Sequence, residues 1–481
     1  MKKLTNYING NLVAPIGGSY LDNIDPSRGK VYSLIPDSDE RDVALAAKAA
    51  KEAFPFWSNL STKKRSDYLL AISERIEARM HEMAEAESLD NGKPISLAME
   101  VDIPRARDNF AFYATAILHE QSESHLMGTT GFNYTLRDAI GVAGCISPWN
   151  LPLYLFSWKI APALASGNTV VAKPSEITPY TAYLLSEICV EINLPPGVLN
   201  IVHGLGPKVG QAISEHPDIP VISFTGGTAT GKQISATAAP LFKKLSLELG
   251  GKNPNIIFAD CDFDEMLKTT LRSSFANQGQ ICLCGSRIFI ERSIYEKFKN
   301  AFVEKVSQMK VGIPSDPKTK MGALVSESHL NKVLSYVKLA QEEGGRVLTG
   351  GNRVILEEAE FKDGYYMRPT IIEGLDAYCR TNQEEIFGPV VSLQAFDTEE
   401  EVLAYANSTR YGLAATLWTS NLQRAHRMAH KLESGIVWVN CWLLRDLRTP
   451  FGGMKQSGMG REGGFEALRF FTEPKNVCIR L

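Results

Sequence analysis

The stretch from 169 to 249 alternates short apolar runs with helical segments, and this pattern constrains the fold more than any other feature. Apolar runs predict strands at 169–172, 198–202, 221–224 and 244–249, with helices beginning near Thr178, Pro207 and Thr228 between them. Repeated βαβ units require a parallel sheet covered by helices. Open sheets of this kind bind ligands at the carboxyl ends of their strands. The residues that follow each strand are therefore the first candidates for a site.

The flanking regions follow other patterns. Apolar residues at three- and four-residue steps predict helices over 43–54, 61–89 and 101–119, whereas 131–146 reads as extended chain. A second α/β unit is predicted from about 255 to 439. The tail, 473–481, has strand character, and we expect it to pair with 131–146. Two such paired segments suit an oligomer contact.

Length and composition exclude several classes of protein. A chain of 481 residues with 44% hydrophobic content is expected to form two or three domains. With a net charge of −3, the chain does not have the excess of basic residues that is typical of a nucleic-acid binder. Neither a signal peptide nor a membrane-spanning run is recognisable, so we expect a soluble cytoplasmic protein that binds neither membrane nor nucleic acid.

The eight cysteines are scattered and have no short repeated spacing. This distribution indicates reduced thiols in a reducing compartment, and no metal site is expected. His426 and His430 stand four residues apart on a predicted helix, but their basic neighbours favour a solvated helix face.

Cys282 and Glu248 are the two residues whose setting indicates chemistry. Cys282 is a soft nucleophile among small and amide residues, and Glu248 is an acidic group at the end of an apolar predicted strand. Together they indicate covalent catalysis by a thiolate with a carboxylate base. The alternative for any single cysteine is a small buried hydrophobe.

A glycine-rich turn follows the strand 221–224 and opens the next helix. Backbone N–H groups at such a turn form an anion site, helped by the helix dipole. The segment from Gly226 to Lys232 is nearly a P-loop, but Gln233 stands where a P-loop needs Ser or Thr to hold magnesium. A nucleotide triphosphatase is therefore disfavoured, while a plain glycine turn without a ligand stays open.

Lys173 and Glu176 follow another predicted strand. Both side chains can hydrogen-bond the vicinal hydroxyls of a ribose, and Glu176 would repel an added 2′-phosphate. This arrangement favours NAD over NADP. A solvated lysine and glutamate without a ligand is the alternative.

Seven motifs, in order along nearly the whole chain, resemble the aldehyde dehydrogenase superfamily. They are 148–150, 173–176, 224–226 with Gly231, 248–252, 279–280 with Cys282, 385–389 and 450–453. The resemblance implies an α/β fold with a Rossmann-type cofactor domain (1–125 and 147–250) and a second α/β catalytic domain (251–440). It also implies a β-arm (126–146 and 465–481) that builds homodimers or homotetramers.

The resemblance assigns roles to individual residues. Cys282 is the implied nucleophile and Glu248 the implied general base, while the Asn150 amide and the Cys282 backbone N–H form the oxyanion hole. Glu462 occupies a position implied to relay protons. The implied NAD-binding residues are Ile146, Pro148, Trp149, Lys173, Ser175, Glu176, Thr225, Gly226, Gly227, Leu249, Glu385 and Phe387. Gly227 replaces a frequent serine, so a side-chain contact to the pyrophosphate is expected to be missing.

Two arginines narrow the expected substrate. In relatives that oxidise apolar aldehydes the position of Arg445 is often aromatic. With Arg105, it resembles the branch that oxidises 2-aminomuconate and 2-hydroxymuconate semialdehydes in tryptophan or aromatic catabolism. Arginine suits their remote carboxylate because its planar fork binds two oxygens at once. Leu151, Leu155 and Trp158 are the implied apolar channel residues.

Several alternatives stay open from the sequence. Arg445 could pair with Asp446, and Arg105 with Asp102 or Asp108, as surface ion pairs. The aldehyde could instead be retinal, betaine aldehyde or an aliphatic semialdehyde. A cysteine acyltransferase or hydrolase is the rival enzyme class, and a non-catalytic structural relative is the remaining possibility.

Overall fold

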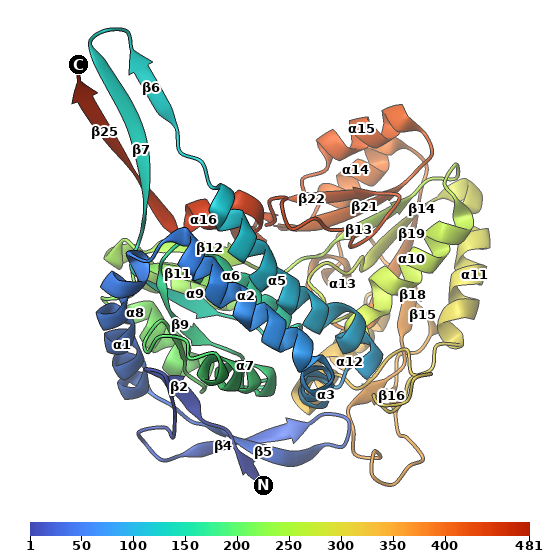
Figure 1. The fold of residues 1–481 in the computed structure, drawn as a ribbon. Helices are drawn as coiled ribbons and strands as arrows, with labels where there is room; N and C mark the ends of the chain where they lie inside the picture. Colours follow the sequence, from blue (N-terminus) through green and yellow to red (C-terminus); the bar gives the residue numbers. More distant parts are fainter.

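Two open sheets, each packed with helices, and a projecting arm make up the computed structural model, which describes residues 1–481 (Figure 1). The larger sheet has the strand order β24-β12-β11-β8-β9-β10-β2-β3. Its strands are β2 (Asn6–Ile8), β3 (Asn11–Val13), β8 (Val142–Ile146), β9 (Thr169–Lys173), β10 (Leu199–Ile201), β11 (Val221–Thr225), β12 (Lys244–Glu248) and β24 (Gly458–Met459). The five central strands are parallel, as the βαβ pattern predicted.

The strand order reverses between β8 and β11. The chain runs from β8 outward through β9 and β10, and then returns to the other side of β8 with β11 and β12. A parallel sheet opens a crevice at such a switch point, at the carboxyl ends of its strands. The segments that follow β8 and β11 therefore flank the expected ligand crevice.

Helices cover both faces of this sheet. Val142 and Ile146 of β8 pack with α1 (Glu40–Ser58), α8 (Gln211–Glu215) and α9 (Thr228–Ala238). Ala143 and Cys145 pack on the opposite face, with α6 (Pro152–Ala165) and α7 (Tyr180–Glu191), because successive side chains of a strand alternate. The outer helices on this face are α2 (Thr62–Ala78), α3 (Met80–Asn91), α4 (Ile95–Leu97) and α5 (Ile103–Ala116).

The second sheet has the strand order β15-β18-β19-β14-β13-β21-β22. Its strands are β13 (Pro254–Ile257), β14 (Arg287–Glu291), β15 (Arg346–Thr349), β18 (Thr370–Glu373), β19 (Val390–Phe396), β21 (Ala414–Trp418) and β22 (Ile436–Val439). Its helices are α10 (Phe263–Phe275), α11 (Tyr295–Ser307), α12 (Glu327–Glu342), α13 (Arg380–Gln383), α14 (Glu399–Asn407) and α15 (Leu422–Lys431). This unit confirms the second α/β region expected over 255–439.

The arm is a three-stranded antiparallel sheet that extends away from the body (Figure 1). It contains β6 (Ser124–Met127), β7 (Gly131–Ala139) and β25 (Thr472–Arg480). The predicted pairing of the tail with the segment near 131 is confirmed, from Thr472 opposite Ala139 to Arg480 opposite Gly131. On one side of the arm β8 pairs inside the larger sheet, and on the other α16 (Gly464–Phe470), which precedes β25, packs against α6.

Two further expectations differ from the structure. The single helix expected over 61–89 is two helices, α2 and α3, separated at Arg79, whose φ of −108° and ψ of 20° leave the helical region. The first forty residues contain short strands that the sequence analysis missed. Besides β2 and β3 they are β1 (Lys2–Lys3), β4 (Tyr20–Asp25) and β5 (Lys30–Pro36).

The remaining short strands are β16 (Arg353–Val354), β17 (Tyr366–Met367), β20 (Tyr411–Gly412) and β23 (Met454–Lys455). No helix is both long enough and apolar enough to cross a membrane.

Candidate active site

Cys282 lies in the connection between α10 and β14, in a loop whose backbone is sharply turned. Asn277 and Gln278 have backbone φ values of 51° and 58°, which residues other than glycine rarely adopt. Gly279 follows with a φ of 69°. A Cβ at Gly279 would lie 2.3 Å from the carbonyl oxygen of Gly388, so only glycine fits there. Asn253 Nδ2 donates to the Cys282 carbonyl over 2.7 Å and thereby ties the loop to the start of the second sheet.

The predicted proximity of Cys282 and Glu248 is present in the structure. Glu248 ends β12, is 2% exposed, and accepts a hydrogen bond from the Cys282 thiol over 3.4 Å. Thr225, opposite Glu248 on β11, donates to the other carboxylate oxygen over 3.0 Å. This geometry lets Glu248 accept the thiol proton directly.

Burial dominates the electrostatics of this pair. Burial raises the pKa of Glu248, and the negative charge of Glu462 raises it further. Burial and the adjacent Glu248 carboxylate raise the pKa of the Cys282 thiol well above its usual range. The thiol is therefore protonated at rest, and attack on a substrate requires that it lose its proton.

A second buried carboxylate stands behind Glu248. Glu462 accepts hydrogen bonds from Lys159 over 2.7 Å and from Ser223 over 2.9 Å. Its other oxygen has no hydrogen-bond partner, although it is buried. Glu462 thus lies close enough to act on Glu248 electrostatically, at the position the resemblance had marked.

Asn150 follows β8 and precedes α6, so it lies at the switch point of the larger sheet. Its backbone carbonyl accepts a hydrogen bond from Asn277 over 2.8 Å, which links it to the Cys282 loop. Its side-chain amide makes no hydrogen bond within the protein, although Asn150 is 2% exposed. It borders the same cavity as Cys282 and is therefore available as a donor to a bound molecule.

Cys282 borders two cavities of more than 200 Å³, besides a very small one of about 20 Å³. The smaller one, about 260 Å³, lies at the crevice of the larger sheet and is lined by Pro148, Trp149, Asn150, Thr225, Gly226, Gly227, Leu249, Gly250, His329, Lys332, Glu385 and Phe387. The larger one, about 520 Å³, is lined by residues of α5, α6 and α10 and shares only Cys282 with the smaller one. Cys282 is therefore the residue at which the two cavities meet.

The smaller cavity suits a dinucleotide. Gly227 precedes α9, no side chain caps this helix, and a Cβ at Gly227 would meet nothing within 4 Å, so free N–H groups and open space remain for an anion. Glu385 accepts from the Gly251 N–H over 2.9 Å, and a Cβ at Gly250 would lie 2.4 Å from Glu385. Phe387 packs edge-on against Trp149 with ring centroids 5.3 Å apart.

The other expected cofactor residues lie farther along the sheet edge and do not line this cavity. Ile146 and Lys173 are paired at the carboxyl ends of β8 and β9. Lys173 Nζ donates to Glu176 over 3.0 Å, and Ser175 Oγ accepts from the Ile177 N–H over 3.2 Å. They lie at the carboxyl ends of β8 and β9, on the same edge of the larger sheet as the smaller cavity.

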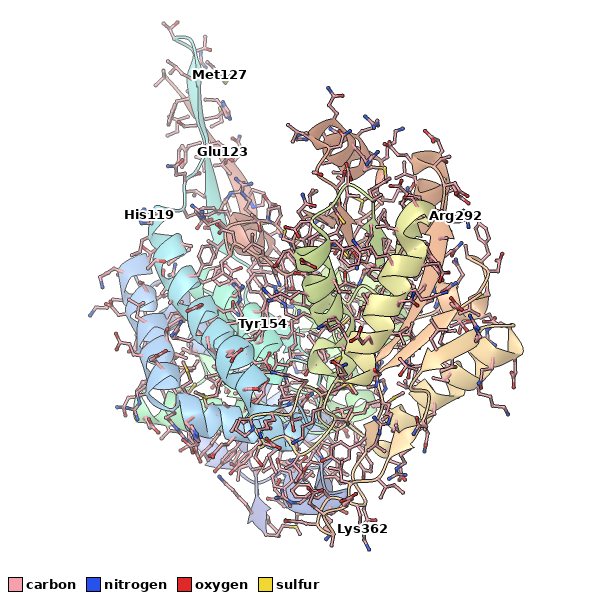
Figure 2. The ribbon with its side chains drawn as sticks, turned by 90° about the vertical axis from the view of Figure 1, so that its right-hand side faces the viewer. His119, Glu123, Met127, Tyr154, Arg292 and Lys362 are labelled. Atoms are coloured by element: carbon pink, nitrogen blue, oxygen red, sulfur yellow. The ribbon has the colours of Figure 1, made fainter.

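Arg445 and Arg105 both line the larger cavity, together with Leu151 and Leu155. Arg445 donates to the Tyr154 hydroxyl over 2.7 Å, and its guanidinium lies 4.0 Å from the centroid of the Phe451 ring. Figure 2 shows Tyr154 near the centre of the molecule, between the two α/β units. The arginines thus line the same cavity as Cys282.

The alternative ion pairs do not form. Asp446 binds Arg448, Asp108 binds Arg107, and Asp102 binds Lys93. Neither Arg105 nor Arg445 forms an ion pair in the structure. Each side chain instead contacts the Tyr154 side chain, Arg105 over the ring at 5.8 Å and Arg445 through the hydroxyl.

Trp158 was expected to line the substrate channel, and the structure corrects this expectation. It does not line the cavity, because it lies one helical turn deeper in α6 and is covered by Arg445, whose guanidinium is 5.2 Å from its ring. The sequence analysis also missed cavity residues, among them Tyr154, Arg272, Trp442 and Phe451. Helical spacing from Leu151 could have indicated Tyr154, and Phe451 belongs to the motif 450–453, whereas no local pattern marks Arg272 or Trp442.

A thiol beside a buried carboxylate, at the edge of a dinucleotide-type sheet, defines an enzyme that works through a covalent thiol intermediate. The profile of the aldehyde dehydrogenase family matches residues 13–477. The chain belongs to the aldehyde dehydrogenase family.

Individual relatives cover the whole chain. It is similar to the 2-aminomuconic semialdehyde dehydrogenase of Danio rerio, with 53% identity over 99% of this chain and 98% of that protein. It is also similar to the 2-hydroxymuconic semialdehyde dehydrogenase of Pseudomonas sp. (strain CF600), with 46% identity over 100% of both chains. The structure of an aldehyde dehydrogenase from Bacillus cereus, solved as an NAD+ complex, superimposes with a TM-score of 0.97 at 38% identity, covering 100% of this chain and 97% of that one.

Replacing Cys282 by alanine is expected to abolish aldehyde oxidation while NAD still binds, because no thioester can form. Cys284→Ala is the matched control. Cys284 lies two residues away with its side chain in the hydrophobic core, so its loss is expected to be mild. Activity is followed as reduced cofactor, and binding by fluorescence titration. An active Cys282 variant beside an inactive Cys284 variant would show that the nucleophile is misassigned.

Replacing Glu248 by glutamine is expected to slow release of the acid by about a hundredfold or more, since it removes a general base. Acyl-enzyme still forms, because removing the carboxylate that raises the pKa of the Cys282 thiol offsets the loss of a base for its proton. A first burst of reduced cofactor followed by a stable acyl-enzyme is therefore the expected signature in stopped-flow and mass spectrometry. The raised pKa of Glu248 has a directional consequence. As pH falls, the basic carboxylate is lost at a higher pH than for an exposed glutamate, so the acid limb of kcat lies at that higher pH. An unchanged acid limb in the Glu248→Gln enzyme contradicts this assignment.

Proposed function

We propose that this enzyme oxidises an aldehyde that carries a remote carboxylate, with NAD as the cofactor, to the corresponding dicarboxylic acid. 2-Aminomuconate and 2-hydroxymuconate semialdehydes are the proposed substrates. The observation that carries this proposal is the presence of two arginines without ion-pair partners in the cavity that opens on Cys282. The two relatives reported above, which are named for 2-aminomuconic and 2-hydroxymuconic semialdehyde, support the same substrate class.

The proposed reaction begins when Glu248 takes the thiol proton and Cys282 attacks the aldehyde carbon. The carbonyl oxygen becomes an oxyanion, for which the Asn150 amide and the Cys282 N–H are the proposed donors. The smaller cavity would hold NAD, which would supply the hydride acceptor needed to convert the tetrahedral adduct into a thioester on Cys282. Glu248 then releases the thiol proton to solvent and removes a proton from the water molecule that attacks the thioester, and the Cys282 thiolate leaves as the acid is formed.

Glu385, Phe387 and the glycines before α9 are the proposed contacts for the nicotinamide half of NAD, and Lys173 with Glu176 for the adenosine ribose. Lys173 and Glu176 bind each other across 3.0 Å, so a ribose diol would replace or bridge this pair. The presence of Glu248 as a base argues against an acyltransferase, because transfer to another thiol needs no activated water.

The arm is the proposed site of homodimer or homotetramer formation. Leu126 and Met127 near its tip are 71% and 51% exposed, which is costly for apolar side chains that stay in water. Figure 2 shows Met127 at the far end of the arm, well away from the body.

We propose the cytoplasm as the compartment, consistent with eight cysteines that are all free thiols.

NAD is expected to be preferred to NADP, because the Glu176 carboxylate would face an added 2′-phosphate. Glu176→Gln removes this repulsion. It is expected to lower the ratio of kcat/KM for NAD to kcat/KM for NADP by about tenfold, which corresponds to about 1.4 kcal/mol. The measurement is kcat/KM for both cofactors with both enzymes. Equal specificity constants in the unaltered enzyme would reject the assignment.

Arg445→Ala is expected to lower kcat/KM for a muconic semialdehyde by about 30-fold or more. Losing one partner of a buried charge pair typically costs about 2–5 kcal/mol, and 1.4 kcal/mol corresponds to tenfold. The same change should hardly affect benzaldehyde, which carries no carboxylate to bind. Arg105→Ala is expected to act in the same direction and less strongly.

Arg448→Ala is the matched control, since Arg448 is three residues away and pairs with Asp446 at the surface. It should leave both substrates unchanged. An equal loss on the charged and the neutral aldehyde in the Arg445→Ala enzyme would make Arg445 structural and remove the main support for the proposed substrate.

A further inference from the structure

A fully buried cluster of three charged side chains lies beside the active site and has no part in the reaction described above. Lys93, Glu87 and Asp102 all have completely buried side chains. Lys93 Nζ lies 2.6 Å from Asp102 Oδ2 and 3.5 Å from Glu87 Oε1. The three residues come from the end of α3, the segment after it, and the turn that begins α5.

The cluster contacts the backbone of Asn150. Lys93 Nζ donates to the Asn150 carbonyl over 3.2 Å, and Asn277 donates to the same oxygen over 2.8 Å. Asn91 binds the preceding carbonyl, that of Trp149, over 3.0 Å. The peptide of Asn150 is therefore held by donors from two directions, while its side-chain amide has no partner in the protein.

The cluster also holds the helix that follows Asn150. Glu87 Oε2 accepts a hydrogen bond from the Leu153 N–H, in the first turn of α6, over 3.3 Å. No side chain of α6's own N-terminus caps that helix. A carboxylate at this end satisfies a free N–H and faces the positive end of the helix dipole. Lys93 and Glu87 thus hold the chain that follows the Asn150 side chain, and Asn91 holds the Trp149 carbonyl that precedes it.

Stability alone does not account for such a cluster. Burial raises the pKa of both Glu87 and Asp102, which is the sign of a large desolvation cost for the two carboxylates. A buried ion pair is often no more stabilising than apolar residues of the same volume. Asp102 borders the larger cavity, and its Oδ1 has no hydrogen-bond partner. The cluster therefore joins the wall of the substrate cavity to the peptide of Asn150.

We propose that Lys93 is a positioning residue for catalysis: held by Glu87 and Asp102, it orients the Asn150 peptide so that the Asn150 amide faces the oxygen of an aldehyde attacked by Cys282. This inference rests on the proposed role of Asn150 as an oxyanion donor. Lys93 itself touches neither substrate nor cofactor, and it acts only through the backbone that it holds.

The test is a double-mutant cycle between Lys93→Met and Asn150→Ala, with stopped-flow measurement of the first turnover of reduced cofactor. Asn150→Ala alone should slow this step by about a hundred- to a thousandfold, as for loss of one oxyanion donor. Lys93→Met alone should slow it by about 10- to 100-fold, because a misplacement of about 1 Å costs on the order of a hundredfold. In the Asn150→Ala background, Lys93→Met should cost less than about threefold, because there is no amide left to orient.

Lys243→Met is the matched control. Lys243 is also buried and donates to main-chain carbonyls, over 2.6 Å to His216 and 3.4 Å to Ile213, but it lies away from Asn150. Its loss should lower thermal stability and leave the first turnover unchanged. NAD affinity, measured by fluorescence titration, should stay the same in the Lys93→Met enzyme.

Losses that multiply in the Lys93→Met/Asn150→Ala enzyme would overturn the inference, since Lys93 would then act independently of the amide. An Asn150→Ala enzyme with an unchanged first turnover would instead overturn the oxyanion role on which it rests. If Lys93→Met does not fold, Asp102→Asn provides the same cycle, since it removes the charge nearest to Lys93 and keeps its size. Its loss should likewise vanish in the Asn150→Ala background, and a loss that persists there overturns the inference.

Discussion

The contact between the Cys282 thiol and the Glu248 carboxylate, 3.4 Å long, joins two halves of the molecule. Glu248 ends a strand of the larger sheet, whereas Cys282 belongs to a loop of the second sheet. Their separation therefore depends on how the two sheets pack. Polar contacts fix that packing where it matters: Asn277 to the Asn150 carbonyl, and the Gly251 N–H to Glu385. Since a shift of about 1 Å between reacting groups can cost a hundredfold in rate, these contacts between the sheets are as important as the reacting groups.

Burial then sets the protonation of the site. Burial raises the pKa of both Glu248 and Cys282 and so favours the neutral form of each. The hydrogen bond from the Cys282 thiol to the Glu248 carboxylate requires a proton on the sulfur. In the proposed reaction a single carboxyl group serves twice, first for the thiol proton and later for the water proton. Lys159 offsets the second carboxylate, Glu462, across 2.7 Å, which keeps this concentration of negative charge from raising the Glu248 pKa further.

The sequence allowed the strands of the larger sheet to be predicted because each is a short apolar run followed by a turn and a helix. It brought Cys282, Glu248 and Asn150 together only through the motifs that resemble the aldehyde dehydrogenase family, because no local pattern shows that segments so far apart meet. It could not predict strands of two or three residues such as β1, since periodicity needs a longer run to be visible. Nor could it show that α2 and α3 separate at Arg79, because helical spacing continues through that residue.

The partners of charged side chains were the hardest part to foresee, because they come from distant segments. Nothing near Lys93 in sequence indicates that it reaches the Asn150 carbonyl 57 residues away. Likewise, Asp446 directly follows Arg445, yet the guanidinium turns to Tyr154, 291 residues away, and Asp446 binds Arg448. Sequence proximity favours the neighbouring ion pair, whereas the fold places the helix α6 next to the Arg445 loop.

That choice of partner bears on selectivity. A guanidinium over aromatic rings keeps some compensation for lost water through its contact with the ring faces, and guanidinium is more weakly hydrated than an ammonium group. One N–H of Arg445 is used by Tyr154, which leaves others for an incoming carboxylate. A neutral aldehyde makes no such contact, and when it is bound the Arg445 guanidinium has no charged partner and only part of its water. In the proposed reaction, discrimination in this cavity arises both from the attraction of a substrate with a carboxylate and from the cost of leaving the arginines unpaired with one that lacks it.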